Sequence, residues 1–233
     1  MISERKFSNS YSSFWNQLLP TADSFVRRLN LASERFTKPL YSAIPINRNK
    51  RAVINELAFR LFKEKTICDK ISLSKIILLE KNVRAYIERL APSIKKIRAL
   101  SKEELLEAQK IADSLSAYFY KHDFKAITFW PLFKGCGQLD ACKADIIYKK
   151  KLIEVKAGER HFRITDLRQI ITYLSLNFYS QQYRIENIAL VNPRTGKEFE
   201  CAIDPLIESC SGRKSVDVFS DVIDFISTEV ESK

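Results

Sequence analysis

The sequence predicts an α/β fold, with a mixed central sheet preceded by a helical extension. Up to about residue 121, apolar residues recur at three- and four-residue steps, the period of an amphipathic helix. Beyond it the period shortens, and from residue 101 the order is helix, three strands, helix and strand. At 45% hydrophobic and 29% charged, the 233 residues can bury a full core. We assign residues 1–100 to a basic α-helical extension and residues 101–233 to the α/β domain.

The helical half contains three long apolar stripes. The first begins at Val53 and the second at Ile76. The third helix is expected to start at Ser101, because Glu104 three residues later completes a capping box. Residues 37–50 contain two prolines and are expected to connect helices.

The second half is rich in short β-type segments. The expected strands cover residues 125–133, 144–148, 151–157, 188–191 and 199–202. The expected helices cover residues 165–179 and 217–230.

Charge and cysteine content narrow the function classes. The formal net charge of +11 indicates a polyanionic partner, either nucleic acid or an anionic membrane surface. No apolar run approaches the roughly 20 residues of a membrane span, and no secretory signal is evident. Five scattered cysteines without a CxxC pair, and only two histidines, indicate free thiols and argue against a zinc or iron–sulfur site. We expect a cytoplasmic protein.

Two acidic residues are expected to meet across a hairpin. If Lys149 and Lys150 form the turn, Asp145 lies opposite Glu154, and Lys156 shares the face of Glu154. Opposed Cβ atoms lie about 4.5–5.5 Å apart, close enough for both carboxylates to share a divalent cation. The alternative is a solvated strand face with ordinary ion pairs. Lys-Lys is also a poor two-residue turn, so another register is open.

The helix after these strands adds two polar side chains. At 100° per residue, Gln169 and Tyr173 share a face that avoids the apolar stripe. One interpretation is a plain solvent-facing surface. The other places this face beside the carboxylates, where both side chains could donate hydrogen bonds to phosphate or around the lysine.

Together these residues resemble the PD-(D/E)XK nuclease superfamily, in its RecB-like branch. The matching elements are the family aspartate, the (D/E)-X-K element and the Q-x-x-x-Y signature, which here are Asp145, Glu154-Val155-Lys156 and Gln169 with Tyr173. The resemblance covers roughly residues 103–202 and rests on about five positions. Ala144 replaces the proline expected before the aspartate.

The resemblance implies a restriction-endonuclease-like αβββαβ core and a magnesium-dependent nuclease. Mg²⁺ or Mn²⁺ would be held by the two carboxylates and a main-chain carbonyl, those of Asp145, Glu154 and Val155. The lysine would orient the hydrolytic water, and the glutamine and tyrosine would support substrate and site. Relatives often add an acid from an earlier helix, and the candidate here is Glu107, beside the apolar stripe of its helix.

The basic excess suggests where nucleic acid is held. Up to residue 120 the chain has 22 Lys and Arg against 12 Asp and Glu, whereas the rest is nearly neutral. We therefore expect the helices to grip the phosphate backbone while the acidic site cuts it. The candidate contacts are Arg48, Lys50, Arg51, Arg163 and Arg168.

Several partners and roles follow by resemblance alone. DNA is favoured over RNA, and a helicase or ATPase partner or a homodimer would suit a small nuclease in phage defence or DNA processing. Two other classes stay open: a catalytically inactive nucleic-acid-binding module of the same fold, and a basic membrane-surface or adaptor protein.

Overall fold

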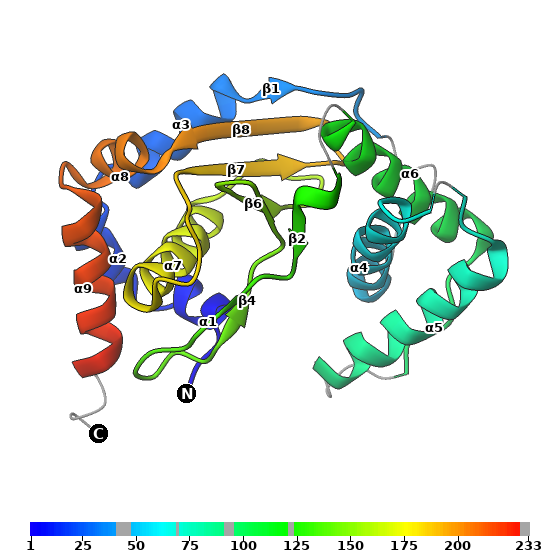
Figure 1. Cartoon of the computed structure of the whole chain (residues 1–233), viewed down its shortest axis with the longest axis horizontal. Coiled ribbons are helices and arrows are strands. Elements are labelled where there is room, and N and C mark those ends of the chain that lie inside the picture. The colour runs from blue at the N-terminus through cyan, green and yellow to red at the C-terminus, as the bar shows by residue number, and fades with distance from the viewer. Residues whose placement is uncertain (41–47, 69, 91–95, 121–123, 229–233) are drawn as a thin grey trace.

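The computed structural model describes residues 1–40, 48–68, 70–90, 96–120 and 124–228 (Figure 1). Its six-stranded sheet has the order β1-β8-β7-β6-β5-β2. Strands β6 and β7 are parallel and the other neighbours antiparallel, which confirms the predicted mixed α/β class. The six strands are β1 (Glu34–Arg35), β2 (Ile127–Phe129), β5 (Ile146–Tyr148), β6 (Lys151–Val155), β7 (Asn187–Asn192) and β8 (Lys197–Ala202). A separate ribbon pairs β3 (Leu132–Phe133) with β4 (Cys142–Lys143).

Helices cover both faces of the sheet (Figure 1). On each face a separate hydrophobic cluster lies between the helices and the strands. The first cluster contains residues of α1 (Glu4–Asn9), α2 (Ser12–Leu18), α3 (Ala22–Ala32), α7 (Ile164–Ser180), α8 (Ile203–Ser211) and α9 (Ser215–Thr228). The second contains residues of α4 (Arg48–Lys65), α5 (Leu73–Leu90) and α6 (Lys102–Phe119). Both clusters combine residues from before and after residue 100, so the predicted boundary between extension and domain runs through two shared cores.

The central strands are apolar on both faces because both faces are covered. In β6, Leu152 points into the cluster of α7, whereas Ile153 points into the cluster of α4 and α6. The same alternation runs through residues 188–191 of β7. Since side chains alternate along a strand, Glu154 lies on the face that α7 covers.

The β5–β6 hairpin has the predicted register. Ile147 pairs with Leu152, and Tyr148 pairs with Lys151. The turn forms between two lysines because Lys149 takes a left-handed conformation, with φ of 54°. A residue other than glycine pays a modest cost there, and the pairing of two apolar strands on both sides of the turn offsets it.

Several elements differ from the prediction, among them β1, a strand of the main sheet that lies within the predicted helical extension. The expected strand over residues 125–133 is broken at Trp130, whose φ is 50°, and the following Pro131 has no N–H for a sheet ladder. Helix α8 follows β8 directly and was not predicted. It ends at Gly212, which has the left-handed conformation (φ of 68°) typical of a helix C-terminus.

The helix starts are partly as expected. The capping box of α6 is present: Glu104 N–H donates to Ser101 Oγ, and Ser101 N–H donates to the Glu104 carboxylate at 2.7 Å. Of the predicted connection, residues 41–47 lie outside the described part, as do the predicted helical residues 229–230. Within the described ranges, no helix combines the length and the apolar character that crossing a membrane requires.

The N-terminal helices are anchored by one tryptophan. Trp15 of α2 is fully buried, and its Nε1 donates to the carbonyl of Phe7 at 3.1 Å. The Arg168 guanidinium of α7 lies over the indole, 5.7 Å from its centroid. These contacts tie the first two helices to the helix that carries the glutamine and tyrosine of the predicted site.

We expect Trp15→Ala to lower the free energy of unfolding by about 3–5 kcal/mol, because a large buried side chain is replaced by a cavity. Urea unfolding followed by circular dichroism measures the loss. Leu31→Ala, on the exposed side of α3 (87% exposed), is the matched control and should stay within about 0.5 kcal/mol. A loss equally small at both positions would show that α1–α3 are not part of the cooperative core.

Candidate active site

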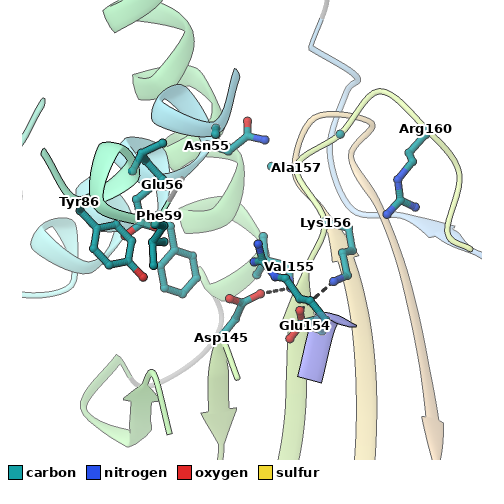
Figure 2. Close-up of a pocket in the computed structure, with 15 residues that line it drawn as sticks. Asn55, Glu56, Phe59, Tyr86, Asp145, Glu154, Val155, Lys156, Ala157 and Arg160 are labelled. Atoms are coloured by element: carbon teal, nitrogen blue, oxygen red, sulfur yellow. Dashed lines mark hydrogen bonds and ion pairs between the residues drawn. The ribbon is translucent and has the colours of Figure 1, made fainter. Parts of the chain in front are cut away.

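The β5–β6 hairpin brings the two predicted carboxylates together, one directly before β5 and the other near the end of β6. The observed register, continued by one residue, places Asp145 opposite Glu154. Asp145 Oδ2 accepts a hydrogen bond from the backbone N–H of Val155 at 2.7 Å, which fixes its carboxylate beside β6 (Figure 2). Glu154 is 3% exposed, so this acid is buried beneath α7.

Lys156 compensates the buried acid directly. Its Nζ donates to Glu154 Oε1 at 2.8 Å and to Gln169 Oε1 at 2.6 Å, and lies 3.7 Å from Asp166 Oδ1. Burial by itself lowers the pKa of Lys156, but the charges of Glu154, Asp166 and Asp145 outweigh it, and the net pKa is raised. The lysine is therefore a protonated hydrogen-bond donor at neutral pH, not a base.

The predicted glutamine and tyrosine complete a chain of hydrogen bonds. Gln169 Nε2 donates to the Tyr173 hydroxyl at 2.8 Å, and that hydroxyl donates to the carbonyl of Lys143 at 3.2 Å. Neither side chain faces solvent: Gln169 is 5% and Tyr173 is 1% exposed. The solvent-facing interpretation is therefore wrong, because other helices and the sheet enclose α7 on all sides over residues 166–176.

Asp166 is a further member of this polar group. The Arg160 guanidinium donates to both of its oxygens, at 2.6 and 2.7 Å, and the N–H of Arg163 donates to one of them at 2.9 Å. Burial would raise the pKa of Asp166, but the hydrogen bond from Arg160 and the charge of Lys156 lower it below its usual value. An ionised Asp166 thus holds both cations at the first turn of α7.

Helix α1 contributes residues that the sequence did not predict. Glu4 Oε1 lies 3.5 Å from Gln169 Nε2, and Arg5 lies 3.8 Å from Glu4 and lines the same pocket as Asp145. The sequence feature that could have indicated α1 is Ser3, which caps the helix by accepting a hydrogen bond from the N–H of Lys6. A helix of six residues is too short for an apolar stripe to mark it.

Two features of the carboxylates suit a divalent cation. Glu154 Oε2 is buried and has no hydrogen-bond partner. Burial, together with the charge of Glu154, raises the pKa of Asp145 to about 8. A hard cation bound by oxygens would compensate both groups, and Mg²⁺ commonly binds through one or two carboxylates while keeping several waters. In the described ranges, His, Cys, Asp and Glu side chains form no metal-binding group of three or more, so the predicted Asp145, Glu154 and Val155 carbonyl would need water as further ligands.

These groups open into a pocket of about 390 Å³. One wall is formed by the predicted site and the loop after β6, up to Arg160. The opposite wall comes from α4 and α5, and Figure 2 shows Glu56, Phe59 and Tyr86 across the pocket from Asp145. The helices before residue 100 are thus part of the candidate site.

Glu107, the predicted third acid, has another partner. Its carboxylate forms an ion pair with Arg194, which is 2% exposed and also donates to the carbonyl of Ala157 at 3.1 Å. A carboxylate that already neutralises a buried guanidinium is a poor candidate for a metal ligand, because removing it would leave the arginine charge uncompensated.

The predicted phosphate contacts differ in their surroundings. Lys50 pairs with Glu104 at 2.7 Å, and Arg51 lies 3.6 Å from Glu159. Arg163 is exposed. The side chain of Arg48 lies outside the described residues.

Arg168 requires a correction. It is only 6% exposed, lies over the Trp15 indole and donates to Asn16 Oδ1 at 3.1 Å. Its guanidinium joins α7 to α2, so it packs the core and does not offer its charge to a phosphate at the surface.

Stability without metal should depend on pH through Asp145. Its pKa is raised to about 8 in the folded state from an ordinary value near 3.8, so the folded state binds the proton more tightly. The stabilisation is present below about pH 4 and is lost as pH rises toward 8. We expect Asp145→Asn to flatten this fall in thermal midpoint, and Mg²⁺ at pH 8 to raise the midpoint of the unmodified chain but not of the variant. Identical pH profiles for both would contradict the raised pKa of Asp145.

The variant Glu107→Gln tests whether Glu107 is a metal ligand or the partner of a structural ion pair. We expect it to cost about 1–3 kcal/mol in urea unfolding, because a hydrogen bond to a buried charged group is weakened, and to leave the Mg²⁺-dependent rise in melting temperature unchanged. Glu103→Gln, on the exposed first turn of the same helix, is the matched control. Loss of the Mg²⁺ response at unchanged stability would make Glu107 a ligand after all.

Comparison with known proteins adds no relative. The chain matches no family model and no curated protein sequence. The resemblance to PD-(D/E)XK nucleases therefore rests on the five positions themselves, and the side chains at these positions are interpreted from their geometry.

Proposed function

We propose that this chain is a metal-dependent nuclease that hydrolyses phosphodiester bonds of nucleic acid, with DNA favoured. One observation carries the proposal. Lys156 Nζ contacts both a buried carboxylate, Glu154, and the amide of Gln169, while the second oxygen of that carboxylate is left without a partner. A purely structural ion pair would be expected to satisfy both oxygens, because an unpaired buried oxygen is costly.

Each group in the pocket has a role in this chemistry. Asp145, Glu154 and the Val155 carbonyl would hold Mg²⁺, which when bound supplies positive charge for the phosphate and lowers the pKa of water. Two of the three N–H donors of Lys156 serve Glu154 and Gln169. The third can orient the attacking water toward phosphorus.

The surrounding cations suit a phosphate group. Arg5 and Arg160 both line the pocket. Arg160 already pairs with Asp166 through two guanidinium nitrogens, so Arg5, which lies 3.8 Å from Glu4, is the cation that would attract the phosphodiester to the acidic site. Gln169 and Tyr173 act through the lysine, by fixing the position of its ammonium group.

We expect Asp145→Ala and Lys156→Ala each to lower Mg²⁺-dependent cleavage of DNA by about 10²-fold or more, because each removes a group that touches the reacting atoms or their cation. The measurement is release of a fluorescent label from an oligonucleotide, with purified protein and with EDTA as the metal-free reference. The thermal midpoint of each variant tests whether the fold is kept, which matters most for Lys156→Ala because that change leaves the buried Glu154 carboxylate uncompensated.

Matched controls come from the exposed start of α9. Lys214→Ala and Asp217→Ala remove the same types of charge far from the pocket residues in sequence and should retain full activity. If both pocket variants cleave as fast as the unmodified chain, the proposal is wrong. Metal-independent binding of DNA without cleavage would instead favour an inactive binding module of the same fold.

A further inference from the structure

The wall of the pocket opposite the carboxylates is formed by aromatic and apolar side chains. Phe59 of α4 and Tyr86, Ile87 and Leu90 of α5 line it. These residues belong to apolar stripes, yet only some of them are core: Phe59 is 6% exposed, whereas Leu90 is 63% exposed. Metal binding needs no aromatic or apolar wall. We therefore expect these side chains to contact a part of the substrate other than the phosphate.

Tyr86 is held in place at this wall by charged neighbours. The Arg60 guanidinium lies over its ring, 5.1 Å from the centroid, and Arg60 in turn pairs with Glu56 at 2.8 Å. Behind them, Phe59 packs edge-on against Trp130 with centroids 5.5 Å apart. Arg60 thus covers one face of the Tyr86 ring, and the rings of Tyr86 and Phe59 lie across the pocket from Asp145 (Figure 2). Rigid aromatic rings are the usual platforms on which unpaired bases stack.

The size of the pocket sets what can enter it. At about 390 Å³ it is near the lower end of the roughly 300–1,000 Å³ typical of small-molecule sites. One nucleotide unit is of that scale. A base pair consists of two such units, so it does not fit within the volume available to one. Within a duplex, each base is also stacked between its neighbours and has no free face to offer to a tyrosine inside a pocket.

We infer that the site takes an unpaired nucleotide, in a single strand or a frayed end, and stacks its base on Tyr86 while its phosphate lies at Asp145 and Glu154. The inference rests on the proposed nuclease function and specifies its substrate class. Tyr86 is then a specificity-determining residue that touches the base and not the reacting phosphate.

The test compares a short single-stranded oligonucleotide, the blunt duplex of the same sequence and a nitrophenyl ester of thymidine monophosphate, all with Mg²⁺. We expect the single strand to be cleaved faster than the duplex. Tyr86→Ala should raise KM for the single strand by about 5- to 150-fold, the usual contribution of one base–aromatic stack, with a smaller change in kcat. Tyr86→Trp should restore a low KM, because stacking and not the hydroxyl is required.

Tyr120→Ala is the matched control, since Tyr120 is 83% exposed at the end of α6 and does not line the pocket. It should leave KM unchanged. Equal cleavage of single strand and duplex, with KM unaffected by Tyr86→Ala, would overturn this inference and leave the nuclease proposal standing. No cleavage of any of the substrates would overturn the nuclease proposal and this inference with it.

Discussion

The ammonium group of Lys156 is the interaction on which the rest of the site depends. Glu154 is buried under α7, and an uncompensated carboxylate there would cost several kcal/mol. Lys156 compensates it at 2.8 Å, but the lysine side chain is itself only 16% exposed and needs further acceptors. It finds them on α7, in Gln169 and more distantly in Asp166. One buried charge thus determines which polar residues α7 must carry on a face that would otherwise be apolar.

The same requirement extends outward to the ribbon beside the sheet. The amide of Gln169 uses the Tyr173 hydroxyl as its acceptor, and that hydroxyl donates to the Lys143 carbonyl on β4. The sheet, α7 and the β3–β4 ribbon are therefore joined through a continuous series of hydrogen bonds. In a low-dielectric interior each member of such a series makes the loss of another more costly, which favours one arrangement of the whole group.

Local rules were enough to predict the centre of the site. The alternation of side chains along a strand gives the Asp145–Glu154 pairing once the turn is placed at Lys149, and a slip by one residue would have turned Leu152 and Glu154 to the other face of the sheet. The 100° step of a helix likewise put Gln169 and Tyr173 on one face. Neither rule says what covers that face, so burial on all sides of α7 could not be foreseen.

Sequence reasoning did not foresee the partners of Arg168 and Glu107, because these partners are distant in the chain. Arg168 has its partners on α2, roughly 150 residues earlier, and Glu107 finds Arg194 in the turn between β7 and β8. Short helices such as α1 also escape periodicity, although Ser3 gave a capping signal. Such contacts depend on the packing of whole elements, which neither composition nor spacing encodes.

The helices before residue 100 gain a different role from the one that their charge suggests. Two α4 cations that are expected to grip phosphate lie beside acids: Lys50 pairs with Glu104, and Arg51 lies near Glu159. Arg60 of the same helix pairs with Glu56. Neutralised cations steer polyanions weakly, because the local field of each pair is small. What α4 and α5 do present to the pocket is an aromatic wall opposite the carboxylates. Their contribution to specificity is therefore better explained by shape and stacking, which distinguish a free base from a paired one, than by attraction to a backbone that single strands and duplexes share.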